Sequence, residues 1–162
     1  MTKTGKIALA VAAAGLFTGA LTATAPAASA QPTEFTTLVS SEKYGNFLHP
    51  GPGDDVTLGD SSEWTFQEVA PGTYEIRAAN RPGAPCITSF GQGDAVKLAE
   101  CGFPFGNQTW KLQPAKPGQT EPVLIEAAGH PGEVLEPHGV GEKVTLEPLN
   151  GDVAQQWKVY GR

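Results

Sequence analysis

A unit of similar sequence occurs three times along this chain, and each copy ends near a tryptophan. The chain has 3 tryptophans, spaced 46 and 47 residues apart. They occur in the segments Ser62-Glu63-Trp64, Gln108-Thr109-Trp110 and Gln155-Gln156-Trp157. Similarity at a fixed period of this length indicates repeated structural units. The last Gln-x-Trp therefore completes a third copy.

Other features of the unit recur in the same order. A Val-x-Leu pattern precedes each tryptophan, starting at Val56, Val96 and Val144. An Ile-x-Ala-Ala-x-x-Pro-Gly pattern starts at Ile76 and Ile125, and the first copy keeps only its apolar start and its glycine. Counting from these starts aligns Gly45 with Gly83 and Gly132, and Leu48 with Cys86 and Leu135.

Each unit contains four short apolar segments separated by clusters of Gly, Pro, Asn and Asp. Such segments are typical of strands and such clusters of turns. With 20 glycines and 14 prolines, the chain is not expected to form a long helix after its first thirty residues. Three units of four strands predict an all-β protein, a β-trefoil, with repeats at about 34–69, 70–118 and 119–162. Barrel closure would leave no exposed sheet edge, which suits a soluble monomer.

The repeated tryptophans are predicted to fill the barrel core. Gln108 and Gln155 would satisfy backbone groups near the turns. The alternative is that Trp64, Trp110 and Trp157 are sugar-binding aromatics.

The first thirty residues resemble a secretory signal peptide. Lys3 and Lys6 precede an apolar run, and Ala28-Ser29-Ala30 fits a cleavage site of small residues. A membrane anchor is the alternative, but the run is short and broken for a bilayer span. We therefore expect a signal peptide at 1–30 and one secreted, extracellular domain at 31–162.

The predicted mature domain is strongly acidic. Residues 1–30 hold two lysines and no acidic residue, so their removal takes the net charge from −6 to −8. A surface of this sign repels nucleic acid and anionic membranes. Neither is expected as a partner.

The 2 cysteines, Cys86 and Cys101, both lie in the predicted mature domain. An even number of cysteines in an exported protein predicts a disulfide, with two free buried thiols as the alternative. Closing a loop of about 15 residues contributes roughly 3 kcal/mol in the chain-entropy model.

The segment "CITSFGQGDAVKLAECGFPFGNQTW" resembles the Gln-x-Trp repeats of the ricin-B-type trefoil lectins. That resemblance implies the β-trefoil fold over about the whole mature chain. Sugar-binding copies of the family carry an aspartate shortly after the position of Leu48, Cys86 and Leu135, and no copy of this chain has it. The residues that would accept sugar hydroxyls instead are His49, Thr88 and Glu136.

A second resemblance is to the fungal cospin-like trefoil inhibitors of serine proteases. It is carried by "WTFQEVAPGTYEIRAAN" and "EVLEPHGVGEKVTLEPL" and by the end of the chain just after the last tryptophan. Because the aspartate is missing from all three copies, we expect an inhibitor of an extracellular peptidase, with a glycan as the alternative partner. The basic residues that a trypsin-like pocket would accept are Lys43, Arg81 and Lys116.

Enzymatic motifs are absent from the sequence. It has no Gly-x-Ser-x-Gly, no His-Glu-x-x-His and no phosphate-binding loop. The 3 histidines, His49, His130 and His138, fall in turns rich in Pro and Gly. We therefore expect a binding protein that is not an enzyme and needs no metal or cofactor.

Overall fold

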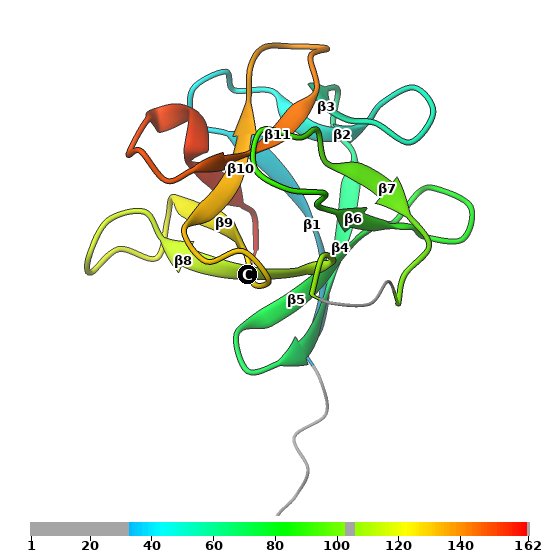
Figure 1. Ribbon diagram of the computed structural model, residues 1–162, viewed down its shortest axis with the longest axis horizontal. Helices are drawn as coiled ribbons and strands as arrows, with labels where there is room; N and C mark the ends of the chain where they lie inside the picture. The colour runs from blue at the N-terminus through cyan, green and yellow to red at the C-terminus, as the bar shows by residue number, and fades with distance from the viewer. Residues whose placement is uncertain (1–32, 103–105, 162) are drawn as a thin grey trace, which may run out of the picture. The chain divides into compact units, whose positions relative to one another are not determined.

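The computed structural model describes residues 33–102 and 106–161, shown in Figure 1. The predicted signal peptide lies outside these residues. The regular structure of the described part consists of strands joined by turns, with one short 3₁₀ segment, η1 (Val153–Gln155). No helix among the described residues has the length and apolarity needed to cross a membrane.

Twelve strands follow one another within residues 33–102 and 106–161. The first four are β1 (Glu34–Ser41), β2 (Phe47–Pro50), β3 (Val56–Gly59) and β4 (Glu63–Ala70). The next four are β5 (Thr73–Ala78), β6 (Cys86–Thr88), β7 (Lys97–Ala99) and β8 (Thr109–Pro114). The last four are β9 (Val123–Ala127), β10 (Glu133–Pro137), β11 (Val144–Pro148) and β12 (Trp157–Val159).

Six of these strands close into an antiparallel barrel. β1 pairs with β4, β4 with β5, β5 with β8 and β8 with β9. β12 then pairs with both β9 and β1, so the strand of the last Gln-x-Trp closes the ring. The other six strands form three hairpins, β2–β3, β6–β7 and β10–β11 (Figure 1). This arrangement is the β-trefoil expected from the three repeats.

Alternation of side chains along the strands explains which face is buried. In β4, Trp64 and Phe66 are fully buried while their neighbours Glu63 and Thr65 are not. Successive side chains of a strand point to opposite faces, so a period of two places the apolar set inside the barrel.

The glycine shared by the three copies has a conformational reason. Gly45, Gly83 and Gly132 lie in the turns before β2, β6 and β10, with φ angles of 73°, 76° and 87°. Residues with a Cβ rarely adopt this left-handed conformation, whereas glycine does so at little cost. The glycine of the repeat therefore fixes the turn into each hairpin.

All three tryptophans are core residues with no exposed surface. Each indole Nε1 donates a hydrogen bond to a backbone carbonyl of the hairpin in its own repeat. The acceptors are Leu48 O at 2.9 Å from Trp64, Ile87 O at 3.1 Å from Trp110, and Leu135 O at 3.1 Å from Trp157. The tryptophans thus join barrel to hairpins, and none presents a ring face to a sugar.

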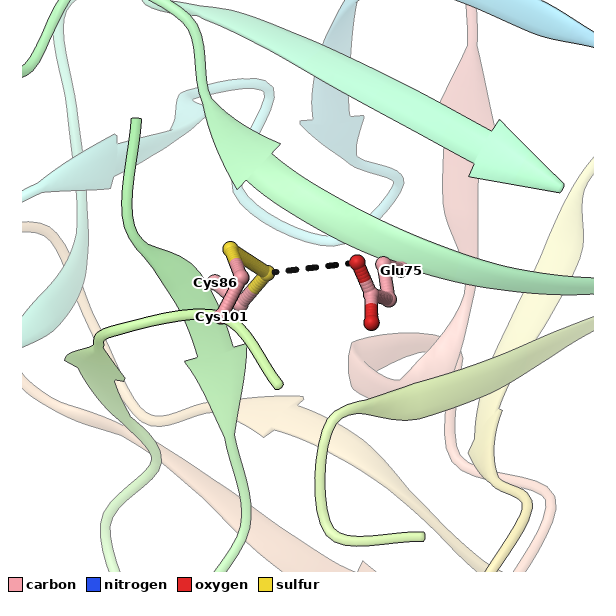
Figure 2. Close-up of side chains that lie close together, drawn as sticks. All are labelled: Glu75, Cys86 and Cys101. Atoms are coloured by element: carbon pink, nitrogen blue, oxygen red, sulfur yellow. Dashed lines mark hydrogen bonds between the residues drawn. A yellow bond between two sulfur atoms is a disulfide. The ribbon is translucent and has the colours of Figure 1, made fainter. Parts of the chain in front are cut away.

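The Cys86–Cys101 disulfide is present, as predicted. It ties β6 to the segment that follows β7, across a sequence separation of 15 residues. In Figure 2 the Glu75 carboxylate lies beside it, with Oε2 3.8 Å from the Cys86 sulfur, while Arg77 donates to the same oxygen at 2.7 Å. These carboxylate and sulfur atoms lie within 4.8 Å of one another, but both sulfurs are bonded together and so offer no thiolate to a metal ion.

Two substitutions at Trp157 distinguish the contribution of its buried ring to stability from the contribution of its hydrogen bond. Trp157→Ala leaves a large cavity and should lower the free energy of unfolding by about 3–5 kcal/mol. Trp157→Phe keeps most of the apolar ring but leaves the buried Leu135 carbonyl without its donor, which should cost about 1–3 kcal/mol. Urea denaturation measures both, and midpoints equal to that of the wild type would contradict the core assignment.

Candidate functional site

Hairpin register identifies the equivalent positions of the three repeats. The residue whose carbonyl binds the tryptophan pairs across its hairpin with a leucine in every copy, as Leu48↔Leu58, Ile87↔Leu98 and Leu135↔Leu146. The next residues along the strands are therefore equivalent, and they are His49, Thr88 and Glu136. The structure brings the three predicted sugar-binding residues to one position of the repeat.

The same register corrects one alignment made from sequence. Counting along the chain matched Cys86 with Leu48 and Leu135, but Ile87 occupies that position. Ile87 supplies the carbonyl bound by Trp110, and Cys86 lies one residue earlier on β6. The error arose because the turn from Arg77 to its partner Cys86 is one residue longer than the turn from Glu126 to Val134 and two longer than the turn from Ser40 to Phe47. Sequence spacing alone does not reveal this difference.

In the second repeat this position is closed. Thr88 has no exposed surface, and its hydroxyl accepts a hydrogen bond from Gln108 Nε2 at 2.9 Å. The same Gln108 nitrogen donates to Glu100 O at 2.8 Å. Thr88 and Gln108 therefore support the hairpin from inside and offer no accessible group to a ligand.

In the first repeat the equivalent residue is His49, which lies beside a groove. No glutamine of the repeat covers it. His49 is half-buried, and its ring lies so close to Gly59 that a Cβ there would come within 3.1 Å of it. The groove beside it has a volume of about 640 Å³, and Asn46, Asp60 and Val140 contribute to its walls. Ser62 replaces the glutamine of the other copies. No hydrogen-bond partner for His49 Nδ1 exists among the residues that the structure describes.

In the third repeat the position carries a supported carboxylate. Glu136 is half-buried, and its Oε2 accepts a hydrogen bond of 2.7 Å from Gln155 Nε2. Gln155 is fully buried, with Nε2 also donating to Pro148 O at 2.8 Å and Oε1 accepting from Asn150 N at 2.9 Å. Within the described ranges, no protein group binds the second carboxylate oxygen of Glu136. A fixed amide thus orients a carboxylate that keeps one oxygen for a ligand.

Other polar side chains share the outer face of the β10–β11 hairpin with Glu136. Thr145 lies opposite Glu136, and Glu147 is two residues further along β11, which places it on the same face. Thr145 Oγ1 donates to Glu147 Oε1 at 2.8 Å and lies 2.7 Å from His138 Nε2. Since the hydroxyl has one proton, His138 Nε2 is the donor in the second bond.

We call these four residues, Glu136, His138, Thr145 and Glu147, the third-repeat face. Sequence reasoning identified only Glu136, and treated His138 as an exposed turn residue. The alternation of polar residues in "VTLEP" carried the signal for Thr145 and Glu147, but only the hairpin register shows which residues they oppose.

The segment that carries Gln155 is anchored by Asp152. Asp152 Oδ1 caps η1 by accepting a hydrogen bond from Ala154 N at 2.8 Å. This hydrogen bond, with the nearby charge of Lys43 as a smaller contribution, holds the pKa of Asp152 below its usual value of 3.8.

Two of the three basic residues predicted to enter a peptidase are engaged within the protein. Lys43 Nζ lies 3.5 Å from Asp152 Oδ1 and 5.6 Å from the centre of the Tyr44 ring. Arg81 Nη2 donates to Pro50 O at 3.2 Å and also to Gly51 O. Lys116 is exposed in the connection between β8 and β9. The structure thus does not bring these residues together, and their roles stay predictions.

Comparisons with known proteins show the fold and no family. The chain matches no protein-family model and no curated protein. Among solved structures it resembles a ricin B-like lectin from Macrolepiota procera in complex with lactose, at 15% identity and a TM-score of 0.63, covering 77% of this chain and 94% of the lectin. The Rhizoctonia solani agglutinin is 17% identical with a TM-score of 0.58, covering 78% of this chain and 94% of the agglutinin.

The similar structures also include proteins that are not described as lectins. A designed 3-fold symmetric protein, ThreeFoil, is 18% identical with a TM-score of 0.61, covering 76% of this chain and 96% of its own. A salivary protein from Culex is 15% identical with a TM-score of 0.63, covering 81% of this chain and 96% of its own. Because one fold supports several functions, the comparisons establish the β-trefoil and leave the activity to be argued from the site.

The cap of η1 predicts a pH dependence. A lowered pKa in the folded state means that ionised Asp152 adds stability above its unfolded-state pKa, and that this contribution is lost as the pH falls through the lower, folded-state pKa. Asp152→Asn keeps an acceptor for Ala154 N–H but has no charge to titrate. The urea midpoint should therefore fall less between about pH 6 and pH 3 in the variant than in the wild type. An equal fall in both proteins would contradict this prediction.

Proposed function

We propose that this protein binds carbohydrate, without catalysis, through the third-repeat face. The observation that carries the proposal is the hydrogen bond between Gln155 and Glu136. It holds a carboxylate at the position where the resemblance to ricin-B-type lectins places the sugar-binding aspartate. The lectin neighbours support the glycan alternative of the sequence prediction, and none of the comparisons supports peptidase inhibition.

The chemistry of the face suits sugar hydroxyls. An ionised carboxylate accepts hydrogen bonds from hydroxyl donors, and these charge-assisted bonds are stronger than neutral ones. Glu136 is oriented before any ligand arrives, because the amide of Gln155 is held by Pro148 and Asn150. Pre-organisation of this kind reduces the entropy lost on binding.

Two exposed apolar side chains in the segment before Gln155 would contact the C–H surface of a bound sugar ring. Leu149 and Val153 lie in the segment that leads to Gln155, with 51% and 48% of their surface exposed.

The charge of the face limits the class of glycan. Glu136 and Glu147 are two carboxylates on one hairpin face. They would repel sialylated or sulfated sugars, since like charges brought together are unfavourable. We therefore propose neutral glycans as the ligands.

The test is a glycan array followed by calorimetry with the best neutral ligand. Glu136→Gln removes the charge at nearly constant shape and should weaken binding about tenfold or more, as expected for a hydrogen bond to a charged group. Glu34→Gln, an exposed position on β1 with the same change of charge, is the matched control and should bind like the wild type.

The proposal would be overturned by a glycan array that shows no neutral ligand, or by equal glycan affinity in Glu136→Gln and the wild type. Inhibition of trypsin, chymotrypsin or subtilisin by the wild type, with no glycan bound, would restore the peptidase interpretation.

We also propose that residues 1–30 direct export. The Cys86–Cys101 disulfide supports this, because such bonds persist in oxidising compartments outside the cytosol. The N-terminal sequence of protein recovered from the culture medium should begin near Gln31. A product that retains Met1 and stays with the cells would contradict export.

A further inference from the structure

The segment that leads into η1 contains an asparagine followed directly by a glycine, Asn150-Gly151. This segment connects β11 to η1 and is drawn in orange-red in Figure 1. The chain has 4 asparagines, and the other three precede Phe47, Arg81 and Gln108. Asn150 is therefore the asparagine after which the next peptide nitrogen has no side chain beside it.

Water and hydroxide have free access to this segment, because all residues from 149 to 153 are exposed. Apart from its chain neighbours, no heavy atom lies within 4 Å of the position that a Cβ on Gly151 would take. The Gly151 N–H has no hydrogen-bond acceptor among the residues that the structure describes. Removal of its proton therefore breaks no hydrogen bond in that part of the protein.

A glycine after an asparagine favours one reaction for a steric reason. The peptide nitrogen of the next residue can attack the side-chain carbonyl of the asparagine and close a cyclic imide. A Cβ on that next residue crowds the attacking nitrogen, and glycine has none. Arg81 supplies such a Cβ after Asn80, which is also exposed. Asn80 is therefore the matched comparison within the same molecule.

The side chain of Asn150 is folded over the peptide of Gly151. Its Oδ1 accepts a hydrogen bond of 2.7 Å from Asp152 N, two residues further along the chain. This bond closes a turn that includes the Gly151 nitrogen, so it keeps the side-chain Cγ on the side of that nitrogen. The Asp152 N–H also lies beside the oxygen that becomes negative during the attack, and a donor in this place stabilises such a charge.

We propose that Asn150 is a site of spontaneous deamidation through a cyclic imide. Hydroxide removes the Gly151 N–H proton, the nitrogen forms a bond to Cγ of Asn150, and the side-chain amide leaves as ammonia. Water then opens the imide at one of its two carbonyls. Opening at one carbonyl gives aspartate, and opening at the other gives isoaspartate, in which the main chain runs through the side-chain carbons. The net reaction converts one amide and one water into one carboxylic acid and one ammonia.

Isoaspartate at this position weakens the support of Glu136. Asn150 N donates to Gln155 Oε1 at 2.9 Å, and Gln155 Nε2 donates to Glu136 Oε2 at 2.7 Å. Isoaspartate adds an atom to the main chain within the loop that the first of these bonds closes, so the bond loses its geometry. The chemical step does not depend on glycan binding, and only a loss of sugar affinity rests on the proposed function.

Peptide mapping of the aged protein tests the chemical step. The folded protein is incubated at neutral and at mildly alkaline pH, and mass spectrometry follows the change from amide to acid at each asparagine. Asn150 should deamidate at least about tenfold faster than Asn80. Its rate should rise with pH, because hydroxide removes the Gly151 proton. An isoaspartate methyltransferase should label the peptide that contains residue 150.

Three variants assign the reaction and its effect. Asn150→Gln would need a larger imide ring and should abolish the mass change at residue 150, whereas Asn80→Gln should leave the rate at Asn150 unchanged. Asn150→Asp carries the new charge on an unaltered main chain. The isoaspartate fraction, separated by chromatography, should therefore have a lower urea midpoint than Asn150→Asp and should bind the neutral glycan more weakly.

Equal rates at Asn150 and Asn80, or an Asn150 that remains an amide, overturn the proposed modification. An isoaspartate fraction with the urea midpoint of Asn150→Asp overturns the effect on Gln155. A lower midpoint with unchanged glycan affinity leaves the modification in place and contradicts the proposed role of Glu136. The failure of this inference and the failure of the proposed function are thus distinguished.

Discussion

Hydrogen bonds from three indole N–H groups fix the three hairpins to the barrel. Each tryptophan belongs to a barrel strand and donates to a carbonyl in the hairpin of its repeat, at 2.9 to 3.1 Å. Without this donor the carbonyl would be buried and unpaired. The free-energy cost of an unpaired buried group exceeds the net stabilisation that a typical hydrogen bond contributes. The bond therefore fixes each hairpin against the barrel, and it fixes the position of the next residue on the hairpin strand. The position of Glu136 depends on this frame, because it follows Leu135 on β10.

The features that the three repeats share determine the fold, and the positions at which the repeats differ form the candidate sites. His49, Thr88 and Glu136 occupy one equivalent position, yet the first lines a groove, the second is buried under Gln108, and the third is a carboxylate oriented by Gln155. Of the three copies, only the third has an Asn-Gly pair before its tryptophan. Equivalent positions with unequal residues thus give the three repeats different chemistry.

Much of the architecture was predictable because its signals are local or periodic. Tryptophans at a regular spacing, glycines at turns and short apolar segments predicted a β-trefoil, and two cysteines predicted the disulfide. The alignment failed at Cys86, because the turn before β6 is longer than its equivalents and Ile87 takes the expected place. Lys43 was predicted from its loop and its charge to enter a peptidase pocket. Its ion pair with Asp152 was not predictable, because the two residues lie far apart in the chain.

The sequence by itself determined the fold class, since a buried tryptophan, a positive-φ glycine and alternating apolar residues impose their structure wherever they occur. Only the tertiary structure decided which polar residues act together. Glu136 and Gln155 come from different elements, and Asn150 is joined to Gln155 by a hydrogen bond that no sequence pattern indicates. Their distances depend on hairpin register and barrel closure, and a one-residue slip in a strand sends every side chain to the opposite face. Pairings of that kind are set by the packing of the whole barrel, which the order of residues along the chain does not display.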